Sequence, residues 1–217
     1  SAKKFNLNAT FMAKPFSEHA GNGMHAHLSL VDKDGNNVFE VDKDKQPKGI
    51  FANSIAGLLK TTPDFLSFYA PSANSYRRLV HNADHAPTTL SWGNENRTAL
   101  IRLPEASEEA TRLEFRLPSA DSNPYLVFAS ILSSVLSGIT EKYPLDKETL
   151  GNAHAMHEPE LGITWREAVQ KTSQSSVVKA FFGERFQKSY QCVKESEINR
   201  FESTITDFEY NSYLRHL

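Results

Sequence analysis

The sequence predicts an α+β fold, in which an antiparallel sheet is packed by helices and followed by a helical C-terminal portion. Residues 9–31 and 86–117 alternate apolar and polar side chains, as half-buried strands do. Residues 50–60 and 124–139 instead repeat their apolar side chains at helical spacing. Strands come first and helices last along the chain, an order that is typical of α+β domains.

The first two predicted strands, residues 9–14 and 24–31, lie on either side of a glycine-bearing loop. Pro15 ends the first strand, because proline cannot donate a hydrogen bond to a ladder. Alternation divides the second strand into two faces. The apolar face carries Met24, Ala26, Leu28 and Leu30, and the polar face carries His25, His27 and Ser29.

Three further strands are expected at residues 90–92, 99–103 and 112–117. In the last of them, Leu113, Phe115 and Leu117 suit a core face. The opposite face carries Arg112, Glu114 and Arg116. These charges would be costly to bury without partners, so the face is either solvated or occupied by ligands.

The helices are expected to begin at residue 50, with a second short helix starting near Pro63. Asn123 caps a helix over residues 124–139, which we expect to be a buried scaffold helix. Residues 143–163 read as a long loop. Beyond it, Thr164 and Glu167 form a capping box, another helix ends before Gly183, and a long helix is expected from about residue 184 to 215. Its predicted inner face contains Phe186, Tyr190, Val193, Phe201, Ile205 and Phe208.

Composition indicates a soluble globular protein: 39% of the 217 residues are hydrophobic, 23% are charged and the net charge is −2. That charge gives no reason to expect nucleic acid as a partner. We count no apolar run of the roughly 18 residues that span a bilayer and no leader segment, so no membrane is expected. Cys192 is the only cysteine, which excludes an internal disulfide and fits a cytoplasmic location.

Two histidines at i, i+2 on one strand lie roughly 7 Å apart and are able to bind a divalent metal. Spacing alone favours the plainer alternative of two surface histidines. Arginine is the preferred side chain for bidentate contact with phosphate and carboxylate. Together with Glu114 and the glycine loop, the arginines Arg78, Arg97 and Arg102 indicate metal-assisted phosphoryl chemistry.

The segment from Lys14-Pro15 to Gly21-Asn22-Gly23-Met24-His25-Ala26-His27-Leu28-Ser29 resembles the ATP-binding signature of glutamine synthetases. Later blocks occur in the order found in that family: Asn74 to Val80, Ser91 to Arg102, and Arg112 to Tyr125. The resemblance covers essentially the whole chain. It implies the catalytic-domain fold of this family and the synthesis of glutamine from glutamate, ammonia and ATP through a γ-glutamyl phosphate.

The resemblance also implies a role for individual positions. The metal, Mg²⁺ or Mn²⁺, is expected on His25 and Glu114. Glutamate is expected to contact Gly21, Arg78 and Arg116. ATP is expected to contact His27, Ser29, Arg97, Arg102 and Arg112, with Arg97 also catalytic because it faces the transferring phosphoryl group. Family members assemble as stacked rings, so a homo-oligomer is expected for the full-length protein.

One segment departs from the family pattern. Where the family has a glutamate on a flap over the ammonium site, this chain has His85, within Val80 to Pro87. A histidine attracts ammonium less than a carboxylate does, so the amine is either ammonia or a larger amine. His85 is retained as a catalytic candidate. The alternatives are a γ-glutamyl–amine ligase that uses a polyamine or other amine, and a non-catalytic protein of the same fold.

Residues 1–217 are expected to form a single but incomplete catalytic domain. The N-terminal β-grasp domain of the family and its first catalytic strands, which supply other metal-binding glutamates, are absent from this sequence. Two ligands do not satisfy a six-coordinate ion. The isolated chain is therefore expected to be inactive or nearly so.

Overall fold

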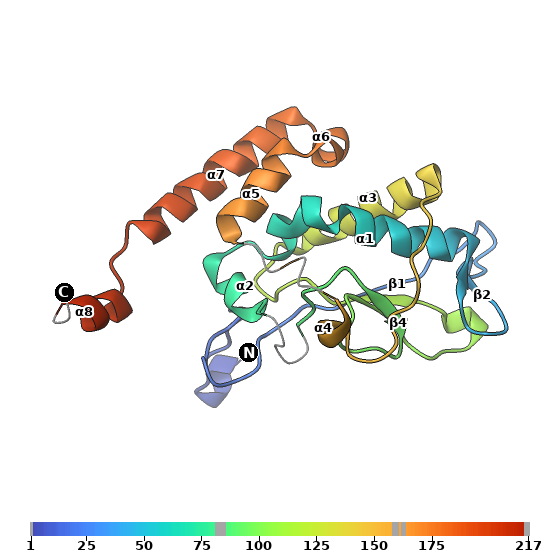
Figure 1. Ribbon diagram of the computed structural model, residues 1–217, viewed down its shortest axis with the longest axis horizontal. Coiled ribbons are helices and arrows are strands. Elements are labelled where there is room, and N and C mark those ends of the chain that lie inside the picture. Colours follow the sequence, from blue (N-terminus) through green and yellow to red (C-terminus); the bar gives the residue numbers. More distant parts are fainter. Residues whose placement is uncertain (1, 81–85, 158–160, 162–163, 215–217) are drawn as a thin grey trace.

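A computed structural model describes residues 2–80, 86–157, 161 and 164–214. Figure 1 shows a layer of helices, chiefly α1 and α3, over a small sheet, with α5, α6 and α7 at one end. The strands are β1 (Ala26–Leu28), β2 (Glu40–Val41), β3 (Pro47–Lys48), β4 (Trp92–Asn94), β5 (Ile101–Leu103) and β6 (Leu113–Phe115). The helices are η1 (Ala2–Phe5), α1 (Gly49–Tyr69), α2 (Ala73–Arg78), η2 (Glu108–Ala110), α3 (Pro124–Glu141), α4 (Ala153–Met156), α5 (Trp165–Gln174), α6 (Ser176–Phe182), α7 (Glu184–Glu202) and α8 (Asp207–Tyr213).

The main sheet has the order β1-β6-β5-β4. The β1–β6 and β6–β5 pairs are antiparallel, as predicted, whereas β4 and β5 run parallel. The register places Glu114 of β6 between two neighbours, His27 of β1 and Arg102 of β5. The pairing of β1 with β6 therefore brings together residues that lie 85 or more positions apart in the sequence.

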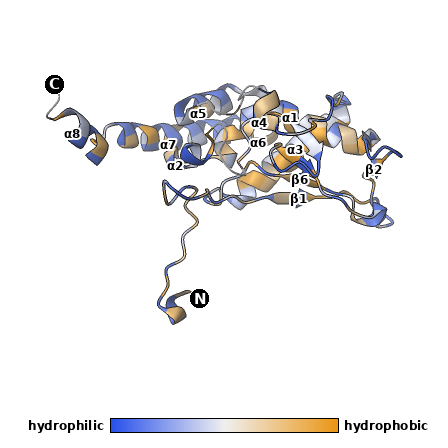
Figure 2. Cartoon of the chain, turned by 60° about the horizontal axis from the view of Figure 1, so that its bottom comes forward, coloured by the Kyte–Doolittle hydropathy of each residue, from blue (hydrophilic) through white to orange (hydrophobic). Residues whose placement is uncertain are grey.

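The predicted strand at residues 9–14 is wrong, and the strand at 24–31 is shorter than predicted. Residues 9–14 form no ladder, and residues 3–12 are exposed (Figure 2). Their backbone groups are open to water, which satisfies them as well as a partner strand would. Only Ala26–Leu28 of the second segment is regular strand, so His25 and Ser29 flank β1.

Helix α1 is a single helix, so the prediction of two helices separated near Pro63 is wrong. Pro63 lies inside α1 and removes one backbone donor. The helix continues because its surroundings bury it along most of its length, including Ile55, Leu58 and Leu66. Tertiary packing outweighs the local preference of proline to begin a helix.

Helices α1 and α3 approach closely where Gly57 faces Gly138. A Cβ on Gly57 would lie 2.2 Å from the carbonyl oxygen of Ser134, and one on Gly138 would lie 2.1 Å from that of Asn53. Both collisions are with backbone, which cannot move aside as a flexible side chain can. Thr61 also links the two helices through a hydrogen bond to Ser134 Oγ at 2.6 Å.

Helix α3 is only half buried, so the expectation of a buried scaffold helix is wrong for one face. Asn123 caps it as predicted, accepting from the N–H groups of Tyr125 and Leu126. The face toward α1 is buried, and the opposite apolar face is exposed at Tyr125, Phe128, Leu132 and Leu136. By length and composition alone α3 is also long and apolar enough to cross a membrane. The expectation that no segment reaches that length is therefore wrong, although the contact with α1 accounts for the apolar residues on its buried face.

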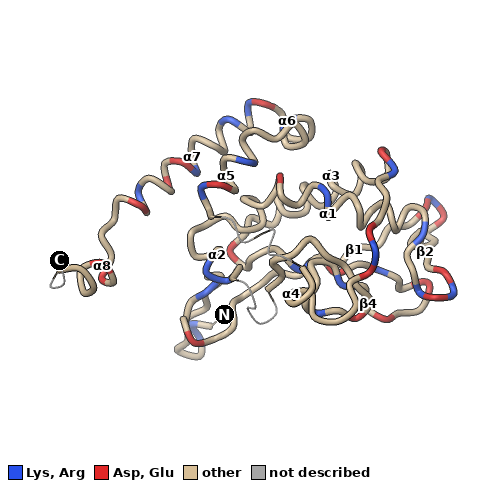
Figure 3. Tube along the Cα trace, viewed as in Figure 1, with Lys and Arg blue, Asp and Glu red and all other residues tan. Residues whose placement is uncertain are grey.

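The C-terminal prediction of one long helix is also wrong. Helix α7 ends at Glu202, and α8 begins after Thr206, which forms a capping box with Glu209. Phe186 and Tyr190 pack against the core as predicted, but Val193, Phe201, Ile205 and Phe208 are exposed. Figure 3 shows acidic and basic residues alternating along the outer part of α7, beyond which α8 projects away from the body. The capping box predicted for α5 at Thr164 is present.

We expect Gly57→Ala and Gly138→Ala each to lower the free energy of unfolding by about 2–3 kcal/mol, because the added methyl must push two backbones apart. Chemical denaturation of the protein measures this. Thr140→Ala, on an exposed position of α3, is the matched control and should change little. If both glycine variants were as stable as that control, the close approach of α1 and α3 would be unimportant for stability.

Candidate active site

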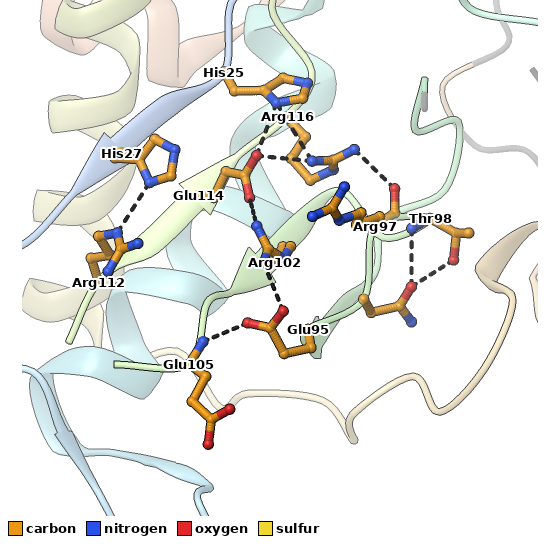
Figure 4. Close-up of polar contacts among 11 residues, drawn as sticks. His25, His27, Glu95, Arg97, Thr98, Arg102, Glu105, Arg112, Glu114 and Arg116 are labelled. Atoms are coloured by element: carbon orange, nitrogen blue, oxygen red, sulfur yellow. Dashed lines mark hydrogen bonds and ion pairs between the residues drawn. The ribbon is translucent and has the colours of Figure 1, made fainter. Parts of the chain in front are cut away.

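The centre of the site is the carboxylate of Glu114, which three cationic or ionisable groups contact (Figure 4). Its Oε1 lies 2.8 Å from Nη1 of Arg116 and 2.9 Å from Nδ1 of His25. Its Oε2 accepts from Nη1 of Arg102 at 2.8 Å. The Glu114 side chain is only 5% exposed, so these partners replace the water that it loses.

Burial of Glu114 by itself favours a higher pKa. The hydrogen bond from Arg102 and the positive charge of Arg116 outweigh this, and the pKa of Glu114 lies below its usual value. Burial lowers the pKa of His25, and the charge of Arg116 adds to that effect despite the opposing attraction of Glu114. Near neutral pH the pair is therefore an ionised carboxylate beside a neutral imidazole, which are the protonation states that a metal ion requires.

A second layer of contacts holds the arginines in place. Arg102 Nη2 lies 2.7 Å from Glu95 Oε2, and Arg116 Nη2 donates to the carbonyl oxygen of Arg97 at 3.0 Å. The polar face that alternation predicted for residues 25–29 is confirmed, because Ala26 is buried, whereas His27 is exposed and the His25 side chain is 32% exposed. At the edge of the site, Arg112 Nε donates to Nδ1 of His27 at 3.3 Å.

His25 and Glu114 fit two neighbouring positions of a divalent ion. A neutral imidazole nitrogen and a carboxylate oxygen are both ligands that a divalent ion would accept, and Nδ1 of His25 lies 2.9 Å from Oε1 of Glu114. Within the described ranges, no group of three histidine, cysteine or acidic side chains is able to hold a metal. Among the described residues, His25 and Glu114 are therefore two candidate ligands and do not form a complete site.

The glycine loop lies directly on Arg78. A Cβ on Gly21 would be 2.7 Å from Cγ of Arg78, and one on Gly23 would be 2.7 Å from its Nη2. Arg78 is 4% exposed and donates to the carbonyl oxygens of Leu117 at 2.7 Å and Arg116 at 3.2 Å. Burial and the charge of Arg116 lower its pKa to about 10, so it remains cationic at neutral pH.

The structure joins most of the predicted residues through direct contacts. His25, Glu114, Arg102 and Arg116 form one cluster, Gly21 contacts Arg78, and His27 contacts Arg112. The side chain of Arg97 is exposed, and within the described residues it has no hydrogen bond or ion pair. Ser29 is also exposed, just beyond β1. His85 lies outside the described residues.

Sequence reasoning missed two residues that shape the site. Glu95 holds Arg102, but it sits in a turn where no alternation marks its direction. Asn96 donates through Nδ2 to the carbonyl oxygens of Thr149 at 2.9 Å and Gly151 at 2.8 Å, which anchors residues 149–151 to the turn that carries Glu95. Neither contact was predictable from the sequence, because the first depends on where β5 places Arg102 and the second on where the chain places Thr149 and Gly151.

A mostly antiparallel sheet with a cluster of arginines around one carboxylate and one imidazole on the face opposite its apolar core is suited to anionic ligands beside a divalent cation. The family profile described as glutamine synthetase, catalytic domain, matches residues 1–213. The chain belongs to the glutamine synthetase family.

Relatives support this assignment and differ in the amine that their names state. The chain is 35% identical over 215 residues to the γ-glutamylputrescine synthetase PuuA of Escherichia coli, covering 99% of this chain and 45% of that protein. It is 37% identical over 228 residues to the glutamine synthetase of Methanocaldococcus jannaschii, covering 98% and 49%. It is 34% identical over 208 residues to the γ-glutamylethanolamide synthetase GlnA4 of Streptomyces coelicolor, covering 96% and 44%.

Two solved structures have the same fold. A structure described as GmaS without ligand matches with a TM-score of 0.87 and 30% identity, over 99% of this chain and 50% of that one. A structure described as a complex of GmaS with ADP matches with a TM-score of 0.86 and 30% identity, over 98% and 50%. The predicted fold class and family are thus confirmed, and the chain spans about half the length of these relatives.

Replacing Glu114 by Gln should lower the free energy of unfolding by about 3 kcal/mol, because Arg102 and Arg116 would lose their shared counter-charge in a buried setting. Denaturant titration of the protein measures the change. Glu184→Gln is the control, since Glu184 pairs with Lys179 and Lys188 at an exposed site. Equal stability of the two variants would show that Glu114 does not neutralise the cluster.

Proposed function

We propose that the whole protein is an ATP-dependent ligase that joins the γ-carboxylate of glutamate to an amine nitrogen. The observation that carries the proposal is the cluster of arginines around His25 and Glu114 on the polar face of the sheet, in a chain of the glutamine synthetase family. A scaffold without activity has no need to keep so many cations around one buried carboxylate. The cost of gathering like charges argues against the non-catalytic alternative.

The proposed reaction has two steps. A γ-carboxylate oxygen of glutamate attacks the γ-phosphorus of ATP, the bond to the β-phosphate oxygen breaks, and ADP leaves. The amine nitrogen then attacks the carbonyl carbon of the γ-glutamyl phosphate, loses a proton and expels phosphate. Negative charge spreads over the phosphoryl oxygens in the first step, so cations that are already in place stabilise it.

Each cation has a proposed part in this reaction. Arg97, whose side chain is exposed, is free to face the transferring phosphoryl group. Arg102 and Arg112 bind the phosphates of ATP, with His27 and Ser29 beside them. Glutamate is held on the other side of the centre by Gly21, Arg78 and Arg116.

His25 and Glu114 are proposed to hold Mg²⁺ or Mn²⁺. When bound, such an ion neutralises phosphate charge and orients the phosphates. The remaining ligands would come from the nucleotide, from water and from other parts of the whole protein. For that reason residues 1–217 are proposed to be one part of a catalytic domain and to be inactive alone. The whole protein is proposed to be a cytoplasmic homo-oligomer, the form expected from its family.

Ammonia is the first candidate for the amine, as in the relatives named glutamine synthetase. An organic amine is the second candidate, and one specific observation favours it. His85 stands where the family has a flap glutamate, so this position lacks the negative charge that would attract a small ammonium ion. Relatives named for putrescine and for ethanolamide have similar identity to this chain, so identity alone does not decide between the two.

Phosphate release by the whole protein, with glutamate, Mg²⁺, ATP and either ammonia or one of a panel of mono- and diamines, tests the function. We expect release to require both glutamate and an amine, because the acyl phosphate turns over only when a nucleophile attacks it. ATP hydrolysis at the same rate with and without glutamate would contradict the proposal. The amine with the highest kcat/KM identifies the second substrate.

His85→Glu tests the role of the flap position. We expect kcat/KM for ammonia to rise at least about fivefold relative to any organic amine, because the new carboxylate attracts a small cation. His81→Glu, in the same segment, is the control for adding one negative charge nearby. If the ratio of kcat/KM for ammonia to kcat/KM for an organic amine were unchanged in the His85 variant, residue 85 would not determine which amine the protein uses.

A further inference from the structure

Glu95 lies in the turn after β4, and its side chain reaches back to Arg102 (Figure 4). The φ of Glu95 is 50°, in the left-handed region that residues with a side chain rarely adopt. Its N–H donates to the carbonyl oxygen of Leu103 at 3.0 Å, which closes the turn against β5. A strained conformation of this kind persists only where its surroundings hold it in place.

The two oxygens of Glu95 have different partners. Oε2 lies 2.7 Å from Nη2 of Arg102, and Oε1 accepts the backbone N–H of Glu105. Arg102 in turn uses its other terminal nitrogen, Nη1, to reach Glu114 at 2.8 Å. One guanidinium is thus fixed between two carboxylates that contact different nitrogens.

This arrangement matters because Glu114 is shared. Its carboxylate also contacts His25 and Arg116, and any group that draws Glu114 toward itself weakens the hold on Arg102. An arginine with one anchor keeps considerable rotamer freedom, and ordering it costs free energy when a ligand binds. The second anchor at Glu95, whose side chain is 50% exposed, removes that freedom in advance.

We propose that Glu95 is a positioning residue for the nucleotide: it holds the guanidinium of Arg102 ready for the phosphates of ATP. The inference rests on the proposed function, in which Arg102 binds ATP. It goes beyond that function because Glu95 itself contacts no substrate. The alternative predicts the opposite effect. If Glu95 blocked the Nη2 group of Arg102 that a phosphate needs, removing the charge of Glu95 would tighten nucleotide binding.

The test uses the whole protein and three variants. Glu95→Gln removes the charge but keeps an oxygen that is able to accept the N–H of Glu105. Glu95→Ala removes both contacts. Glu105→Gln is the matched control, because its carboxylate is a nearby exposed charge that pairs with Lys45 and does not contact Arg102.

Calorimetric titration with Mg²⁺–ATP and steady-state kinetics give the readouts. For Glu95→Gln we expect the Kd and the KM for ATP to rise about tenfold, because the charge-assisted contact between Glu95 and Arg102 is lost. The KM for glutamate should stay within about twofold, and Glu105→Gln should match the wild type in every parameter. A general loss of structure would instead move both KM values and the thermal midpoint.

Wild-type or tighter ATP binding by Glu95→Gln would overturn the proposal, and tighter binding would identify Glu95 as a competitor of phosphate. Weak binding by Glu95→Ala alone would also overturn it, by showing that Glu95 only anchors the loop at Glu105. The binding measurement needs no turnover. A wild-type protein that binds ATP but forms no product with any amine would therefore contradict the proposed function while still testing Glu95.

Discussion

The site depends on the ion pairs that Glu114 makes with Arg102 and Arg116 while it contacts His25. These contacts join β5, β6 and the residue before β1 into one polar centre. Without the carboxylate, two buried or half-buried guanidinium groups would repel each other. With Glu114 on both arginines and Glu95 on Arg102, two carboxylates balance two guanidinium groups, and the other arginines around them remain available for anions.

The helical layer determines which face of the sheet carries the polar site. Helices α1 and α3 pack through Gly57 and Gly138 and form the main core with the apolar residues of β5 and β6. The polar side chains of the same strands point the other way, as the strand repeat requires. The glycine loop completes the site by lying on the buried side chain of Arg78, which packs against Gly21 and Gly23.

Local pattern predicted much of this architecture. Alternation identified the polar faces that carry His25 and Glu114, and the caps at Asn123 and Thr164 are present as predicted. The errors arose where tertiary contacts override local preference: Pro63 lies inside α1, and the apolar stripe on α3 is half exposed. Glu95 was beyond sequence reasoning, because its direction depends on a left-handed turn and on the distance between two strands.

We propose that the whole protein transfers the γ-phosphoryl group of ATP to the side-chain carboxylate of glutamate before the amine attacks. Glutamate labelled with ¹⁸O in its γ-carboxylate tests this most directly, with the released phosphate analysed by mass spectrometry. The proposed sequence of steps predicts one ¹⁸O in each phosphate released during amide formation, because the attacking carboxylate oxygen leaves with the phosphorus. Phosphate without the label would contradict a γ-glutamyl phosphate and, with it, the proposed reaction.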